Sequence, residues 1–127
     1  MSLSDIHASL ANSILFYFVA LAAWGSWRFL RKQGVSSADW GGLAIAEVLL
    51  VLQALLGVYL LIAGFRPARS IHGLYGVVAL LAIPGMYMYT KGRTDRPEML
   101  MYAVVTLITV GLALRAIFTG EVALPGG

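Results

Sequence analysis

The chain has 127 residues, of which 60% are hydrophobic and 12% are charged, and its formal net charge is +3. So little polar surface cannot cover a soluble domain, and the absence of cysteine excludes disulfides, thiolate metal sites, iron–sulfur clusters and thioether-attached haem. The positive charge is spread over short connections, which suits lipid headgroups and excludes nucleic acid as a partner. We therefore expect an integral membrane protein in contact with the lipid bilayer.

Four apolar stretches follow one another, and each is long enough to cross a bilayer as an α-helix, which takes about 20 residues. The first covers about residues 7–30 and ends on a basic cluster. The segment before it lacks the basic region of a cleaved signal peptide, so we interpret this stretch as a retained helix. The second covers about residues 40–65 and follows a polar connection in which Ser36, Ser37 and Asp39 are good helix caps.

A turn around Pro67 separates the second span from the third, which covers about residues 71–90. Pro84 lies inside this third span and is expected to kink it. The segment Asp95-Arg96-Pro97-Glu98 has the cap, the early proline and the acidic first turn of a helix start, and the fourth span covers about residues 97–118. The predicted fold class is all-α, a single four-helix transmembrane bundle over residues 1–127.

The basic residues predict the orientation of this bundle, because Lys and Arg accumulate on cytoplasmic loops. Connections one and three carry six of them and connection two carries only two. Both termini are therefore expected on the outer side, which is the periplasmic side if the protein lies in a bacterial inner membrane. The residues counted are Arg28, Arg31, Lys32, Lys91, Arg93 and Arg96 against Arg66 and Arg69.

The only two histidines, His7 and His72, open the first and third spans. Both lie roughly 30 Å from the inner basic belt at 1.5 Å per helical residue, so they share one depth and one leaflet. Two neutral imidazoles on facing helices suit the axial positions of a non-covalently bound haem b. Taken singly, each histidine is more simply explained as an interfacial residue with one wet edge. Taken together, they favour a shared role as ligands.

Other side chains could complete a haem site. Arg69 and Arg115 fall at the outer ends of their spans and are candidate partners of the haem propionates, although arginines there also reach lipid headgroups. Gly57 and Gly73 could let a flat macrocycle approach the backbone, and they could equally serve ordinary helix packing.

Glu47 is the one acid well inside a span, where an unpaired carboxylate is costly. We expect it to pair with Arg28 or Lys91 near the same boundary, and the alternative is a proton-handling or quinone-site group. Gln53 and Asn12 could form hydrogen bonds between helices or towards a cofactor.

Two segments resemble a known family. The stretch Leu52-Gln53-Ala54-Leu55-Leu56-Gly57-Val58-Tyr59-Leu60-Leu61, followed by Ser70-Ile71-His72-Gly73-Leu74, is similar to the heme A synthase family, in which a Q-x-x-L-G helix precedes a helix that begins with a haem-ligating histidine. The resemblance covers about half the chain and implies haem ligation by His72, with His7 as the second histidine of a four-helix half. Full members of the family have two such halves, whereas this chain has one.

The sequence therefore predicts a membrane b-type haem protein that performs one-electron transfer. A quinone or a redox protein would be its partner, and it could be a subunit of a respiratory complex or a homo-oligomer. Two alternatives stay open, namely a haem-handling enzyme or assembly factor, and a structural subunit without a cofactor. Metallopeptidase, serine-hydrolase and phosphate-loop motifs do not occur, and no catalytic residue is predicted.

Overall fold

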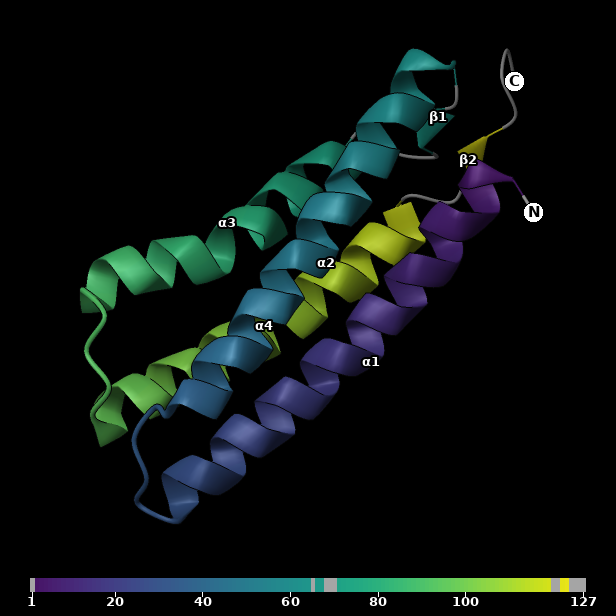
Figure 1. The fold of residues 1–127 in the computed structure, drawn as a ribbon. Helices are drawn as coiled ribbons and strands as arrows, with labels where there is room; N and C mark the ends of the chain where they lie inside the picture. Colours follow the sequence, from purple (N-terminus) through teal and green to yellow (C-terminus); the bar gives the residue numbers. More distant parts are fainter. Residues whose placement is uncertain (1, 65, 68–70, 120–121, 124–127) are drawn as a thin grey trace.

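The computed structural model describes residues 2–64, 66–67, 71–119 and 122–123, and these residues form four long helices and one short pair of strands. The helices are α1 (Leu3–Leu30), α2 (Ser37–Ile62), α3 (His72–Thr90) and α4 (Arg96–Thr119) (Figure 1). The two-residue strands β1 (Arg66–Pro67) and β2 (Val122–Ala123) pair antiparallel, with Arg66 opposite Ala123. The prediction of an all-helical four-helix bundle is confirmed, and this short strand pair was not foreseen.

Successive helices run in opposite directions, so the bundle has two distinct ends (Figure 1). We call the end where α1 and α3 begin the histidine end, because it carries His7 and His72, and the opposite end, near Trp24 and Trp40, the tryptophan end. The pairing of β1 with β2 lies at the histidine end. Helix α4 packs most extensively against α1 and then against α3, while α2 packs mainly on α1.

Local signals set the helix boundaries. Ser2 and Asp5 form a reciprocal capping box, which starts α1 four residues earlier than expected. Ser36 and Asp39 form the same motif at the start of α2. Helix α2 ends at Ile62, earlier than expected, and Gly64 follows with a φ of +100°, a conformation that glycine adopts readily.

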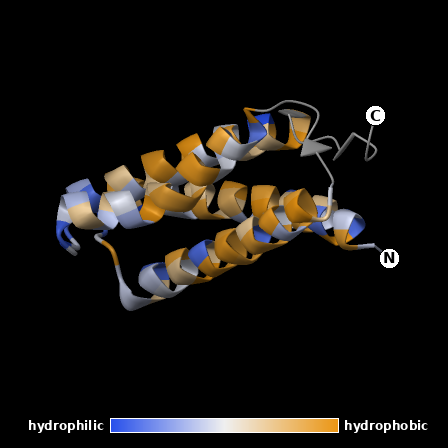
Figure 2. Cartoon of the chain, turned by 90° about the horizontal axis from the view of Figure 1, so that it is seen from above, coloured by the Kyte–Doolittle hydropathy of each residue, from blue (hydrophilic) through white to orange (hydrophobic). Residues whose placement is uncertain are grey.

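The outer surface of the bundle is apolar along most of its length. Large hydrophobic side chains point outward, among them Phe16 at 70% exposure and Ile62 at 81%. Figure 2 shows apolar residues along the bodies of the helices and hydrophilic residues gathered at the loops. All four helices are long and apolar enough to span a bilayer. The structure is thus compatible with a multi-pass integral membrane protein.

The interior combines apolar side chains with hydroxyl groups that have hydrogen-bond partners. Tyr102 is almost fully buried, and its hydroxyl lies 3.0 Å from that of Thr90. Thr106 and Thr109 are buried on the same helix, and each donates to a backbone carbonyl one turn earlier. Trp40 meets the rings of Tyr87 and Tyr102 edge to face, at centroid distances of 5.6 and 5.3 Å. These contacts join α2, α3 and α4 towards the tryptophan end.

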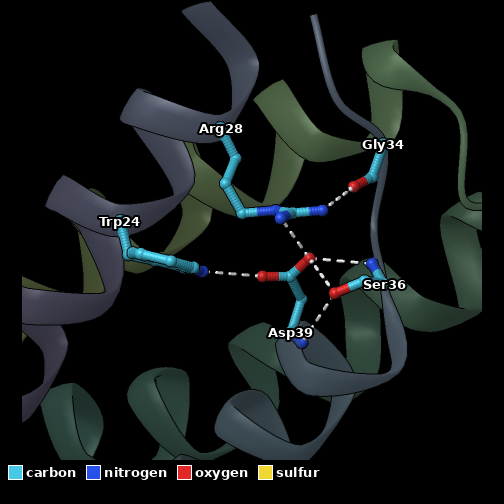
Figure 3. A network of polar contacts seen from close by, with 5 residues as sticks. All are labelled: Trp24, Arg28, Gly34, Ser36 and Asp39. Carbon is cyan, nitrogen blue, oxygen red and sulfur yellow. Dashed lines mark hydrogen bonds and ion pairs between the residues drawn. The ribbon is translucent and has the colours of Figure 1, made fainter. Parts of the chain in front are cut away.

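A polar network fixes the connection between α1 and α2 (Figure 3). Asp39, buried at the first turn of α2, accepts from the indole Nε1 of Trp24 at 2.9 Å and from the backbone N–H of Ser36 at 2.7 Å. Its second carboxylate oxygen lies 3.0 Å from Nε of Arg28, whose Nη2 donates to the carbonyl of Gly34 at 2.9 Å. One carboxylate therefore serves as helix cap, ion-pair partner and indole acceptor at once.

We predict that Asp39→Ala lowers the free energy of unfolding by about 3 kcal/mol, because it leaves the partly buried Arg28 charge and the Trp24 N–H without this partner and removes a cap. Reversible unfolding in mixtures of dodecyl sulfate and mild detergent, followed by circular dichroism, measures the change. The matched control is Asp5→Ala, which removes the equivalent but exposed cap of α1 and should cost no more than about 1 kcal/mol. Equal effects of the two substitutions would refute the proposed importance of the network.

Candidate functional site

The two histidines meet at one end of the bundle. His7 lies in the second turn of α1, His72 is the first residue of α3, and the ring centroids are 6.3 Å apart with an angle of 79° between the ring planes. Both side chains are partly buried. The structure therefore brings together the two side chains that the sequence proposed as a pair, although they are 65 residues apart in the chain.

The ring of His72 is held by α4. Its Nδ1 lies 2.8 Å from the carbonyl oxygen of Ala116. A carbonyl only accepts hydrogen bonds, so we assign the ring proton to Nδ1, which leaves the lone pair on Nε2. Histidines that bind metals commonly have this arrangement, because the bond to a carbonyl fixes the tautomer and the orientation of the ring.

The ring of His7 lies against α2. A Cβ atom added at Gly57 would stand 3.3 Å from Cε1 of His7, so any larger residue there would press on the ring. The side-chain nitrogen of Gln53 donates to the carbonyl of His7 at 2.8 Å. Nδ1 of His7 and Oε1 of Gln53 are buried and have no hydrogen-bond partner among the described residues. Two neighbouring polar side chains, on α1 and α2, therefore have unused hydrogen-bonding capacity within the described residues.

The two imidazoles suit a metal ion whose remaining ligands come from a cofactor and not from the protein. No cluster of three or more His, Asp or Glu side chains occurs in the part of the chain that the structure describes. With metal–nitrogen bonds of about 2.1 Å on both sides, two imidazoles that bind one ion in line have centroids roughly 6 Å apart. The observed 6.3 Å agrees with this value. A haem iron, which has four porphyrin nitrogens, can take up to two further donors from the protein.

The remaining candidates for the haem site differ in what surrounds them. Arg115 is exposed on the last part of α4, and its guanidinium carbon lies 5.8 Å from the ring centroid of Tyr75 on α3. Arg69 lies outside the described residues. Gly73 has open space where a Cβ would be, so its glycine is not required by any contact in the described structure, in contrast to Gly57.

The prediction that Glu47 pairs with Arg28 or Lys91 is wrong. Arg28 pairs with Asp39 at 3.0 Å (Figure 3), and no ion pair of Glu47 with Arg28 or Lys91 occurs among the described residues. The cause is geometric, because the cap position of Asp39 brings its carboxylate to the end of α1, whereas Glu47 lies eight residues further along α2, about 12 Å away along the helix axis.

Sequence reasoning did not identify two contributors to the site, the carbonyl of Ala116 and the ring of Tyr75. Every residue offers a backbone carbonyl, so no sequence signal could have pointed to Ala116. Tyr75 lies three residues after His72 and therefore on the same helix face, which is a signal that could have been used.

Comparisons of the chain with models of protein families, with curated proteins and with solved structures find no match.

We predict that Gly57→Ala displaces the His7 ring and costs about 1 kcal/mol or more of stability, because the added methyl group would lie closer to Cε1 than ordinary contacts allow. Nuclear magnetic resonance of ¹³C-labelled histidine should show a shifted His7 ε1 signal. The control is Gly41→Ala on the same helix, where a Cβ meets no atom within 4 Å. An unchanged His7 signal in the Gly57 variant would contradict the close packing.

Proposed function

We propose that this protein is a membrane b-type haem protein that transfers single electrons, with His7 and His72 as the axial ligands. The observation that carries the proposal is the separation of 6.3 Å between two imidazoles on different helices. The hydrogen bond from His72 to the carbonyl of Ala116 supports it, since that bond leaves Nε2 available to a metal.

The residues of the chain would perform distinct tasks. His72, oriented by α4, and His7, packed against Gly57, would both hold the haem iron, and ligation by two protein side chains would exclude external ligands such as oxygen. Arg115 and Arg69 would supply positive charge for the propionates. When bound, haem supplies a one-electron couple, and ligation by two imidazoles confines it to electron transfer.

The partners and the orientation belong to this proposal. A haem at the histidine end would exchange electrons with a quinone in the same leaflet or with a redox protein at that surface. The distribution of basic residues favours termini on the outer side, which is the periplasmic face of a bacterial inner membrane. Assembly as a homo-oligomer or within a respiratory complex would add a second cofactor to the electron path.

A second candidate function is a cofactor-free structural subunit, and one observation favours it. His72 already has a hydrogen-bond partner, and the edge-to-face packing of the two rings is a helix contact that needs no metal. Purified protein that stays colourless after expression with ample haem would support this candidate. A third candidate is the haem-handling enzyme suggested by the resemblance to heme A synthase, and chemical modification of the bound haem would identify it.

We predict that the purified protein has the visible spectrum of a low-spin, six-coordinate haem with sharp bands on reduction. His7→Ala and His72→Ala should each abolish these bands, because either change removes one of two equivalent ligands. The helices should still insert, since burial in lipid drives insertion. Absorption spectra of detergent-purified variants, oxidised and then reduced, provide the measurement.

The control for this experiment is Phe16→Ala, which shortens an exposed side chain on the same helix and should leave the spectrum intact. Loss of the bands in one histidine variant alone would show that the other ligand is not a histidine. Unchanged bands in both variants would exclude the pair as the site.

We also predict that both termini lie outside the cytoplasm, because six basic residues lie on the first and third connections and two on the second. A reporter enzyme that works only in the cytoplasm should be inactive when fused after Gly127 and active when inserted after Gln33. Activity of the fusion at Gly127 would reverse the orientation.

A further inference from the structure

Glu47 is an acid placed in the middle of a membrane-length helix. It lies ten residues after Ser37, the first residue of α2, which is about 15 Å along the helix axis. It follows Trp40 by seven residues and so shares the face of α2 on which Trp40 meets α3 and α4. The side chain is partly buried, and its Oε1 is a buried oxygen without a hydrogen-bond partner in the described part of the chain.

No basic residue in the described part of the chain forms an ion pair with this carboxyl. Arg28 is held by Asp39 at 3.0 Å, and Arg93 lies 3.9 Å from Glu98. Lys91 directly follows the last residue of α3 and comes four residues after Tyr87, which is level with Trp40, so Lys91 and Glu47 are separated by about 16 Å along the bundle. Ion pairing therefore does not explain how the bundle tolerates Glu47.

Residues with hydroxyl groups are spaced along α4 from the tryptophan end to the level of Glu47. Helices α2 and α4 run in the same direction, and Trp40 meets Tyr102 at 5.3 Å. Seven residues further on, Glu47 is therefore level with Thr109. Tyr102, Thr106 and Thr109 are spaced by four and three residues, which places all three on one face of α4. Each threonine hydroxyl already donates to a carbonyl and retains lone pairs that can accept a hydrogen bond.

We propose that Glu47 is a proton-binding site inside the membrane, a carboxyl that carries its proton at neutral pH and exchanges it with water at the tryptophan end. An ionised carboxylate without a counter-charge is costly in a low-dielectric interior, whereas the neutral acid can donate to a hydroxyl oxygen. The proton comes from water and returns to it, so no redox partner is needed. The proposal holds whether or not haem occupies the histidine pair.

Infrared spectroscopy of the full-length protein in liposomes tests the proposal directly. The wild-type protein should show the carbonyl stretch of a protonated carboxyl at neutral pH, and this band should shift when H₂O is replaced by D₂O. Glu47→Gln should lose the band, and Glu47→Asp should retain one. The matched control is Glu98→Gln, which removes a buried acid that lies near Arg93 and should leave the band unchanged.

Substitutions on α4 test the route by which the proton of Glu47 exchanges with water. Thr106→Val and Thr109→Val together preserve shape and remove both hydroxyls. The band should persist, while its exchange with D₂O slows by about tenfold or more, since loss of even one hydrogen bond changes a rate by about that factor. Thr94→Val, in the exposed loop before α4, should not alter the rate. An unchanged rate in the double variant would overturn the route along α4.

A second measurement does not depend on the folding of any variant. Dicyclohexylcarbodiimide is apolar and reacts with protonated carboxyls in membranes, so mass spectrometry of the treated wild-type protein should find the adduct on Glu47 and not on Asp39 or Glu98. No adduct on Glu47, together with no carboxyl band in the wild-type protein, would show that Glu47 is ionised and would overturn the proposal. These results do not depend on the absorption spectrum that tests the haem.

Discussion

Inside a bilayer no water is available to polar groups, so each donor, acceptor or charge must find its partner within the protein. Much of the described structure follows from this requirement. The hydroxyls of Thr106 and Thr109 donate to carbonyls of their own helix, and Asp39 satisfies Trp24, Arg28 and the start of α2 together. Such satisfied groups stabilise the bundle and need no function to explain them.

A few groups in the described residues depart from this rule, and they lie where chemistry is most plausible. Nδ1 of His7 and Oε1 of Gln53 are buried without a well-formed hydrogen bond at the histidine end, and Oε1 of Glu47 has no partner near the middle of α2. Nε of Arg28 also lacks a hydrogen bond by geometry, but its charge is met by Asp39 at 3.0 Å. A buried polar atom without a hydrogen-bond partner is destabilising inside a membrane. The presence of such atoms at these positions supports the proposals of a ligand near His7 and of a proton on Glu47.

The two ends of the bundle are built differently. At the tryptophan end, the loop between α1 and α2 is tied to the loop before α4, because the N–H of Val35 donates to the carbonyl of Thr94 at 2.8 Å. At the histidine end, hydrogen bonds from Gln53 to the carbonyl of His7 and from His72 to that of Ala116 join the helices, and the pairing of β1 with β2 also lies there. Loops are therefore joined at the tryptophan end, whereas helices and short strands are joined at the histidine end.

The sequence by itself determined the four helices and the common depth of the histidines, because both follow from local properties of the chain. Apolar length, the Ser36 and Asp39 cap, and a constant rise per residue do not depend on distant contacts.

Tertiary structure decided which groups meet. From the sequence, either Asp39 or Glu47 could pair with Arg28. The rotation of α2 and its capped first turn place Asp39, and not Glu47, beside Arg28. The Ala116 carbonyl is one of many identical acceptors, so only the packing of α3 on α4 could select it for His72. The pairing of β1 with β2 joins segments more than 50 residues apart, and two residues carry too little pattern to predict such a contact.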